Sequence, residues 1–148
     1  MATRVFVYGA SGHARVIIDI LERMRDVEVA FAVDDAGTSK TICGYEIIGG
    51  RDELLAQRAR ADAGIVAIGD NKARRDTAAW LVSQKFRLAQ AIHPHAVLAR
   101  DVKIGAGTVI MAGCVVNSDA VLGENVIVNT GATIDQNMVP MKSTRPSG

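Results

Sequence analysis

A period of six residues runs through the last third of the chain. An aliphatic residue stands at every sixth position, and the residue four places further on is mostly small. Neither an α-helix, with about 3.6 residues per turn, nor a plain strand, with a side-chain period of about 2, repeats in this way. A period of six is typical of a parallel β-helix, in which short strands end at tight corners and every sixth side chain points into a narrow shared core. The aliphatic positions are Leu98, Ile104, Ile110, Val116, Leu122, Val128 and Ile134, and the second set is Val102, Thr108, Cys114, Ala120, Val126, Ala132 and Met138.

An antiparallel sheet is the main alternative for this segment. The valine-rich pieces 115–116 and 126–128 would suit strands in which apolar and polar side chains alternate. Alternation has a period of two, however, and does not explain why small residues recur at every sixth position. The sequence therefore predicts stacked β-helical coils, with three hexads to a coil.

Composition limits the classes of partner. The 148 residues suffice for one compact domain or two small ones. The 17 Lys and Arg and 16 Asp and Glu are interspersed and give a net charge of +1, which argues against a nucleic-acid partner. No apolar stretch is long enough to insert into a membrane, and the N-terminal apolar run is too short for a signal peptide. Cys43 and Cys114 lack metal-ligand spacing, so we expect reduced thiols, no metal and a cytoplasmic location.

The first ninety residues follow a different pattern. Apolar runs of strand length alternate with segments of helical spacing. This alternation predicts an α/β fold, a small parallel sheet covered by helices that forms a Rossmann-like half domain. The expected strands are 4–8, 27–33, 64–70 and 88–92, and the expected helices are one that carries Ile17, Ile20, Leu21 and Met24, one over about 52–58 and one over 71–83.

The two patterns meet at residues 91–96, Ala-Ile-His-Pro-His-Ala, where Pro94 interrupts the strand pattern before the hexads begin. We therefore divide the chain into a Rossmann-like domain, residues 1–92, and a short β-helix, residues 93–139. Residues 140–148 are polar, contain proline and lack hexads, so we expect a flexible tail.

A glycine turn, Gly9-Ala-Ser-Gly12, follows the first strand, and His13 comes directly after it. In open α/β sheets a ligand lies beyond the carboxyl ends of the strands, where glycines admit it and the next helix offers free N–H groups to phosphate. A phosphate or pyrophosphate is the expected ligand, and His13 could donate a hydrogen bond to it. Two alternatives stand beside this one: the glycines could serve close packing at the helix entry, and His13 could simply be exposed. The turn holds two of the three glycines of the dinucleotide fingerprint.

Acidic residues end the second expected strand. Asp34 and Asp35 lie about where an acidic residue meets a ribose hydroxyl in nucleotide-binding domains. Acidic pairs after strands are also ordinary solvated turns, so both interpretations stay open at this point.

The turn Gly69-Asp70-Asn71 repeats the passage from strand to helix. Asn71 is the expected helix cap. Arg74 and Arg75 follow one turn later and are interpreted either as solvated charges or as phosphate contacts.

In this order the motifs resemble one family. They are Val7-Tyr-Gly-Ala-Ser-Gly-His13, the strand ending in Asp34-Asp35, Gly44-Tyr-Glu-Ile-Ile-Gly49, Ala67-Ile-Gly-Asp-Asn71, Ile92-His-Pro94 and the hexad run. Over residues 3–135 the chain closely resembles bacterial sugar O- and N-acyltransferases, which include sialic acid O-acetyltransferases and acetyltransferases of nucleotide-linked 4-amino sugars. The resemblance implies an N-terminal Rossmann-like domain that binds the nucleotide sugar and a C-terminal left-handed β-helix that binds acetyl-CoA. It also implies a homotrimer with active sites between neighbouring β-helices.

The resemblance assigns roles to single residues as well. A nucleotide sugar, with a UDP-sugar favoured, is the implied substrate, and Asn129, in Val-Asn-Thr-Gly131, falls where the family lines its acyl-transfer cleft. The implied substrate-binding residues are Gly9, Ser11, Gly12 and His13 for the diphosphate, Asp34 and Asp35 for the nucleoside, and Gly69 and Asn71 to complete the pocket.

The sequence departs from the family at the general base. Acetyl transfer from a thioester to an amine or hydroxyl needs a base, and a histidine oriented by a carboxylate serves near neutral pH. The family's segment resembles Asn-Thr-Gly-Ala-Ser-Ile-Asp-His-Asp-Cys, whereas residues 129–138 read Asn-Thr-Gly-Ala-Thr-Ile-Asp-Gln-Asn-Met. Gln136 and Asn137 therefore replace the pair and cannot take the proton. The hexads also stop after Met138, before the family's later coils, which looks like a C-terminal truncation.

Three functions follow from these observations. The first is an acetyl-CoA-dependent acetyltransferase that acts on a nucleotide-linked amino sugar or sialic acid in surface glycan synthesis. The second is an inactive nucleotide-sugar-binding module that oligomerises through its β-helix. The third is a fragment of a nicotinamide-dependent oxidoreductase, against which the hexads and the two-glycine turn both argue. Because of Gln136, we expect nucleotide-sugar binding with weak or absent turnover, and we interpret His93 as structural rather than as a substitute base.

Overall fold

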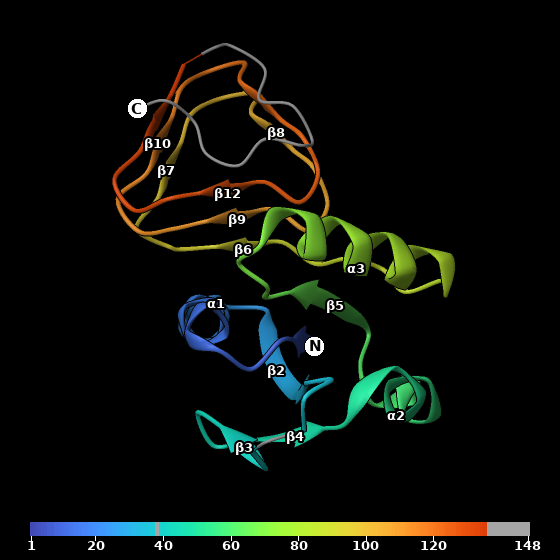
Figure 1. Ribbon diagram of the computed structural model, residues 1–148. Helices are drawn as coiled ribbons and strands as arrows, with labels where there is room; N and C mark the ends of the chain where they lie inside the picture. Colours follow the sequence, from blue (N-terminus) through green and yellow to red (C-terminus); the bar gives the residue numbers. More distant parts are fainter. Residues whose placement is uncertain (38, 136–148) are drawn as a thin grey trace. The chain divides into compact units, whose positions relative to one another are not determined.

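A computed structural model describes residues 1–37 and 39–135. The chain divides into two compact units, one of residues 1–89 and one that begins at Gln90 (Figure 1). The tail expected at 140–148, as well as Gln136 and Asn137, lies outside the described residues.

The N-terminal unit is built on a five-stranded sheet with the strand order β3-β4-β2-β1-β5. β1 is parallel to its two neighbours β2 and β5, β4 is parallel to β2, and β3 pairs with β4 in the antiparallel sense. The predicted parallel sheet is therefore present. Its strands are β1 (Thr3–Tyr8), β2 (Val27–Val33), β3 (Thr41–Ile42), β4 (Tyr45–Ile48) and β5 (Ala63–Val66).

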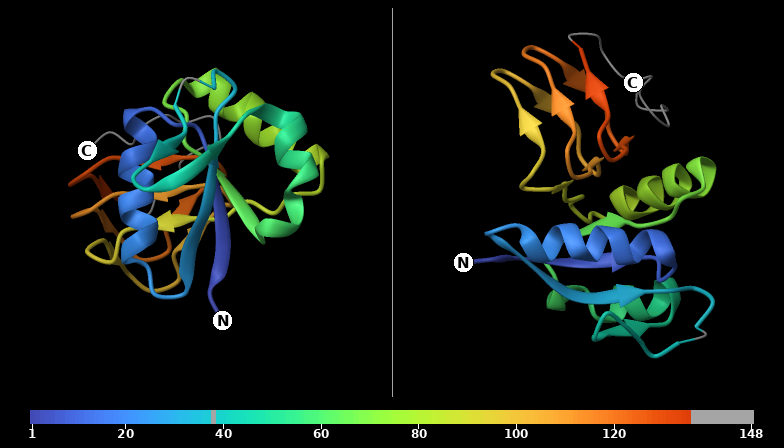
Figure 2. Two further views of the ribbon diagram at one scale, coloured as in Figure 1. Left: turned by 90° about the horizontal axis from the view of Figure 1, so that it is seen from below. Right: turned by 90° about the vertical axis from the view of Figure 1, so that its left-hand side faces the viewer.

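Helices cover both faces of this sheet, with α1 on one face and α2 and α3 on the other (Figure 2). Alternate residues of a strand point to opposite faces. Phe6 and Tyr8 of β1 accordingly share a buried cluster with Leu54 of α2 and Leu81 of α3. The helical elements are α1 (Gly12–Arg23), α2 (Gly50–Ala56), the short 3₁₀ helix η1 (Arg58–Arg60) and α3 (Asn71–Ser83).

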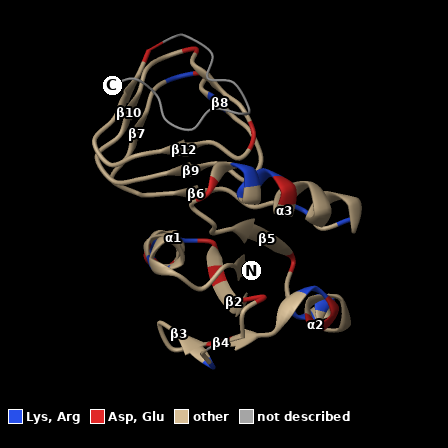
Figure 3. Ribbon diagram, viewed as in Figure 1, with Lys and Arg blue, Asp and Glu red and all other residues tan. Residues whose placement is uncertain are grey.

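Helices α1, α2 and α3 each carry charges of both signs (Figure 3). Arg23 pairs with Asp19 in α1, and Lys72 pairs with Asp76 in α3, each one helical turn apart. Exposed pairs of this kind contribute little to stability, and they reflect the balanced composition of the chain.

The prediction of one strand over residues 88–92 is wrong, because this segment joins two different sheets. Leu88 makes an isolated parallel bridge with Gly64, whereas Ala91–Ile92 form β6 and pair with β9 of the second unit. A short apolar run does not reveal which sheet it joins. The β3–β4 hairpin was also not predicted, although Cys43 and Gly44 at its turn both have positive φ, 51° and 86°, the backbone that two-residue hairpin turns require.

The second unit winds as a parallel β-helix with three faces. Val115 pairs with Val97 of the preceding coil and with Thr133 of the following one, so residues 18 apart stand over one another, as do Asn117 and Asp135. The yellow, orange and red arrows in the right-hand view of Figure 2 are strands of successive coils. The prediction of three hexads to a coil is confirmed. The strands are β6 (Ala91–Ile92), β7 (Val97–Leu98), β8 (Lys103–Ile104), β9 (Val109–Ile110), β10 (Val115–Val116), β11 (Val121–Leu122), β12 (Ile127–Val128) and β13 (Thr133–Ile134).

The six-residue column fills the interior of the coils. Ile110, Val116 and Val128 are fully buried, and Cys114 from the small column packs among them. Leu98 stays 38% exposed, because β7 belongs to the first coil of its stack and is covered by a coil on one side only. The aliphatic period therefore marks core positions.

Thr108 is a polar residue inside this core. Its hydroxyl donates to the Gly123 carbonyl oxygen (2.8 Å) and accepts from the Val126 N–H (3.2 Å). Because the hydroxyl both donates and accepts a hydrogen bond, its burial is not costly. These two bonds also link neighbouring coils.

Candidate functional site

The carboxyl ends of β1, β2 and β5 meet at one edge of the sheet. From β1 the chain passes through α1 to β2 on one side, and it later returns to β5 on the other side of β1. The strand order reverses at β1, and open α/β sheets bind ligands in the crevice beyond such a reversal. The glycine turn after β1 and the residues that follow β5 both leave the sheet at this point.

Gly9 is required by packing. Its φ is +131°, and a Cβ placed on it would lie 2.6 Å from the Ala67 carbonyl oxygen. The backbone is tied on both sides, because the Gly9 N–H donates to the Val33 carbonyl (2.7 Å) and the Ala67 N–H donates to the Tyr8 carbonyl (2.8 Å). Close packing, one of the two explanations left open by the sequence, therefore accounts for Gly9.

Gly12 differs from Gly9. A Cβ on Gly12, the first residue of α1, would have nothing within 4 Å. Ser11, the N-cap of that helix, is exposed and makes no capping hydrogen bond with its side chain in the described structure. The start of α1 thus leaves open space and backbone N–H groups that a ligand could use.

His13 lies in the first turn of α1 and is half-buried rather than exposed. Its Nε2 atom is fully buried and has no hydrogen-bond partner among residues 1–37 and 39–135. Burial lowers the pKa of the imidazole, and the positive charge of Arg74 lowers it further. A buried polar atom without a partner is costly, so this nitrogen is suited to a ligand.

Arg74 joins this edge from α3. Its side chain is buried, with 2% exposed, and its guanidinium donates to the carbonyls of Ile68 (3.3 Å) and Gly69 (3.0 Å) and to the Asn71 side chain (2.7 Å). The interpretation of Arg74 as a solvated charge is therefore wrong. Arg74 stands on the buried face of α3 with Thr77 and Leu81, but the backbone carbonyls that accept its hydrogen bonds could not be read from the sequence.

The helix cap is Asp70, not Asn71. The Asp70 carboxylate accepts the Ala73 N–H (2.9 Å) at the N-cap of α3, and Asn71 is the first helical residue. Asn71 holds the Arg74 guanidinium instead. Gly69, just before this cap, is exposed, and a Cβ there would also have nothing within 4 Å.

The two acidic residues after β2 are used differently. The Asp34 carboxylate accepts the N–H of Ala36 (3.2 Å) and closes its own turn. Asp35 is exposed, and its Oδ1 accepts the hydroxyl of Tyr8 (2.7 Å). Tyr8 was not singled out from the sequence; the one signal was a residue with a hydroxyl at the end of a strand whose preceding residues 5–7 are apolar.

In the second unit, Asn129 follows β12 and is partly exposed. Its carbonyl oxygen accepts the Cys114 thiol (2.9 Å) and the Ala132 N–H (3.0 Å). Burial raises the pKa of that thiol, so Cys114 is a packed and protonated group. Gln136, the position of the family's base, lies outside the described residues.

His93 has a structural contact. Its Nδ1 atom accepts the backbone N–H of His95 (3.0 Å), and the side chain is buried. This hydrogen bond fixes the turn at the Ile-His-Pro junction, which agrees with the interpretation of His93 as structural.

Among residues 1–37 and 39–135, no three His, Cys, Asp or Glu side chains gather closely enough to hold a metal ion. None of the helices found there has the length and hydropathy of a membrane span.

Comparison with known proteins gives these features a family. Residues 4–81 match the PglD N-terminal domain, and residues 101–136 match the bacterial transferase hexapeptide, six repeats long. The chain belongs to the hexapeptide-repeat sugar N-acetyltransferases. The first match runs from β1 into α3 and includes every residue of the candidate edge.

Individual members of the acetyltransferase family are similar over most of the chain. UDP-N-acetylbacillosamine N-acetyltransferase of Bacillus subtilis is 32% identical over 112 residues, which are 73% of this chain and 51% of that protein. The acetyltransferase domain of PglB from Neisseria gonorrhoeae, solved with acetyl coenzyme A, is 31% identical with a TM-score of 0.84, over 93% of this chain and 67% of that one. PerB from Caulobacter crescentus, solved with CoA and GDP-perosamine, is 35% identical with a TM-score of 0.81, over 88% and 62%. The chain thus spans about half the length of the curated relative.

Proposed function

We propose that the carboxyl edge of the sheet binds a nucleotide-linked amino sugar, as part of an acetyl-CoA-dependent acetyltransferase of surface glycan synthesis. One observation carries the proposal. The Nε2 atom of His13 is buried at the reversal of strand order and has no hydrogen-bond partner in the described chain. The buried Arg74 adds positive charge at the same edge and lowers the pKa of this imidazole. A diphosphate would both accept a hydrogen bond from His13 and oppose the buried positive charge.

The proposed roles are those that the family resemblance implies, and the geometry supports some of them. Gly9 keeps the turn close to the sheet, while Ser11, Gly12 and His13 offer open space and donors to the diphosphate. Asp34 and Asp35 lie on the nucleoside side, and Gly69 and Asn71 complete the pocket. A UDP-sugar is our first choice, because the Bacillus relative is named for such a substrate, and PerB with GDP-perosamine makes a GDP-sugar the alternative.

The β-helix is the proposed partner surface and cofactor site. We expect the left-handed form, with acetyl-CoA as co-substrate and Asn129 in the acyl-transfer cleft; the PglB domain solved with acetyl coenzyme A supports this. Val97 and Val115, which stand over one another on the stack β7-β10-β13, are 59% and 37% exposed. An exposed apolar strip on stacked coils supports assembly into a homotrimer.

Acetyl transfer by this chain should be weak. The reaction needs a group that accepts the proton of the attacking amine, and an amide at Gln136 cannot accept it. At the candidate edge we assign His13 to the phosphate and not to the role of base. The second candidate function, a binding module that oligomerises without turnover, rests on the amide at Gln136. Free Cys43 and Cys114 support a cytoplasmic location for either function.

Titration calorimetry and a thiol-release assay test the proposal together. We expect saturable heat with at least one UDP- or GDP-linked amino sugar, and little or no release of CoA from acetyl-CoA in its presence. Absence of binding across the nucleotide sugars would overturn the proposed function. Robust CoA release would instead overturn the expectation of weak turnover, while leaving the substrate site in place.

The affinity for the nucleotide sugar should increase as the pH is lowered from about 7.5 to about 5.5. Burial and Arg74 lower the pKa of His13 in the free chain, so its ring is neutral near pH 7. A bound diphosphate places negative charge beside the ring and raises that pKa, so binding takes up a proton. Calorimetry at both pH values should show several-fold tighter binding at the lower pH for the wild type, and equal affinities for His13→Asn. A wild-type affinity that is independent of pH would contradict the placement of His13 at the phosphate.

A further inference from the structure

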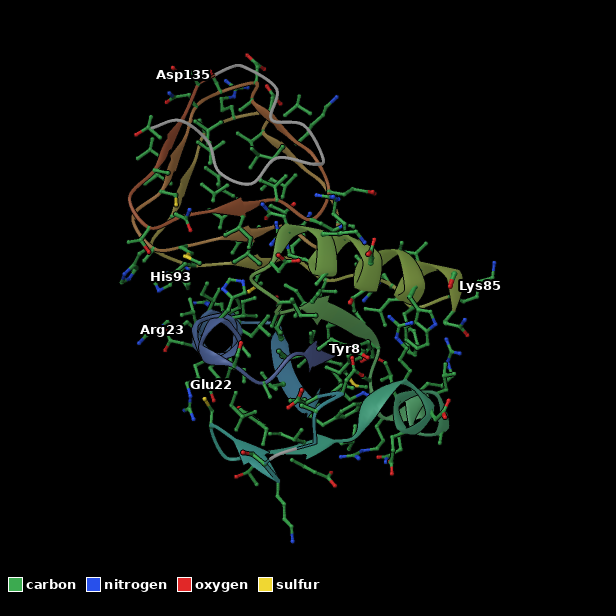
Figure 4. The ribbon with its side chains drawn as sticks, viewed as in Figure 1. Tyr8, Glu22, Arg23, Lys85, His93 and Asp135 are labelled. Carbon is green, nitrogen blue, oxygen red and sulfur yellow. The ribbon has the colours of Figure 1, made fainter. Side chains whose placement is uncertain are left out.

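Tyr8 carries a polar group into the edge of the candidate site. It is the last residue of β1, its side chain is 1% exposed, and its hydroxyl donates to Oδ1 of Asp35 (2.7 Å). Figure 4 labels Tyr8 within the sheet of the N-terminal unit. The two partners are 27 residues apart in the sequence, so the contact exists only because β1 and β2 are neighbours.

The tyrosine is a hydrogen-bond donor at every ordinary pH. Burial and the hydrogen bond to Asp35 raise the pKa of Tyr8 to about 12, while Arg51 acts in the opposite direction. The Arg51 guanidinium is itself stacked over the ring of Trp80, with 4.5 Å to the ring centroid. The phenol therefore stays protonated and always donates.

Asp35 has acceptor capacity left after this contact. A carboxylate offers about four lone-pair sites, and the Tyr8 hydroxyl occupies one of them on an exposed side chain. The neighbouring Asp34 uses its carboxylate to close its own turn on Ala36. Of the two acidic residues, only Asp35 has a carboxylate that is fixed by a hydrogen bond from a strand residue, Tyr8, and is also exposed to solvent.

We propose that Tyr8 is a positioning residue that orients Asp35, so that its carboxylate accepts a hydrogen bond from a donor group of the bound nucleoside. The inference rests on the proposed nucleotide-sugar site and adds to it a residue that selects for the nucleoside. The donor is either a ribose hydroxyl or an N–H of the base.

Tyr8→Phe tests this inference, because the ring stays in the core and only the hydroxyl is lost. We expect about tenfold weaker binding of the nucleotide sugar, as for loss of a hydrogen bond to a charged group. Tyr45→Phe is the matched control, since the Tyr45 hydroxyl also donates to a carboxylate, Oε2 of Glu22 (2.6 Å), on the hairpin and helix α1. That variant should bind like the wild type.

A double-mutant cycle separates positioning from a general structural effect. Asp35→Asn should weaken binding at least as much as Tyr8→Phe, and Tyr8→Phe should add little in the Asp35→Asn background. Analogues of the nucleotide can identify the donor: one with a 2′-deoxy ribose, one with a 3′-deoxy ribose and one with an N-methylated base. The analogue that lacks the donor should bind the wild type as weakly as the intact nucleotide binds Tyr8→Phe. Tyr8→Phe should not weaken the binding of that analogue any further. Full additivity, or unchanged binding by Tyr8→Phe, would overturn the inference while the proposed function stands. Failure of the wild type to bind any nucleotide sugar would overturn both.

Discussion

Gly9→Ala should destabilise the N-terminal unit by about 3 kcal/mol or more and abolish nucleotide-sugar binding. The new Cβ would lie 2.6 Å from the Ala67 carbonyl oxygen and 3.0 Å from its carbon, at a φ of +131°. Both obstacles are backbone atoms, and the Ala67 N–H is bonded to the Tyr8 carbonyl, so β1 and β5 would have to separate. The single tryptophan, Trp80 in α3, reports this unit in chemical denaturation followed by fluorescence.

Gly12→Ala is the matched control in the same turn. Its Cβ would meet nothing within 4 Å, and alanine is the better residue in a helix, so stability should be unchanged or slightly higher. If the turn contacts the diphosphate closely, Gly12→Ala weakens binding without a loss of stability. Equal denaturation midpoints for Gly9→Ala and the wild type would show that the turn is not packed as described.

Gly105→Ala should disrupt the β-helix to a similar extent. The added Cβ would lie 2.5 Å from the carbonyl carbon and oxygen of Gly123 and 2.6 Å from the Glu124 nitrogen, all backbone atoms of the next coil. The two coils are joined there by the Gly105 N–H bond to the Leu122 carbonyl (2.9 Å), so separating them breaks the β8–β11 pairing. We expect a loss of about 3 kcal/mol or more.

Hydrogen exchange read by mass spectrometry can follow this loss, because the β-helix contains no tryptophan. Amides of residues 103–128 should lose protection in Gly105→Ala. Gly131→Ala is the control: its Cβ would meet nothing within 4 Å and only its φ of +75° is unfavourable, at a cost of about 1–2 kcal/mol. Equal protection in both variants would contradict the close stacking of the coils at Gly105.

The β-helix could be predicted from the sequence because each coil repeats the same environment. Ile110, Val116 and Val128 face one core in every coil, so the requirement for an aliphatic side chain recurs with a fixed period. The short strand at 91–92 was given to the wrong sheet. Ile92 stands six residues before Leu98 and fits the same period, but it closely follows Leu88, which pairs with the first sheet.

The candidate site could be predicted in outline, since glycines and polar residues at the ends of parallel strands converge on one edge. Its side-chain contacts could not. Arg74 lies on the face of α3 that carries Thr77 and Leu81, and its charge is accommodated there because the carbonyls of Ile68 and Gly69 accept its hydrogen bonds. Tyr8 meets Asp35 only through the order of the strands. Which of these residues contact a ligand stays a prediction.

Mapping of nucleotide binding by amide chemical shifts in the full-length, isotope-labelled chain tests the central claim most directly. On titration with a UDP- or GDP-linked amino sugar, the largest saturable shifts should fall on residues 9–13, 34–35 and 69–71, at the carboxyl edge of the sheet. Shifts confined to the β-helix, or no saturable shift with either nucleotide, would contradict a nucleotide-sugar site in the N-terminal unit.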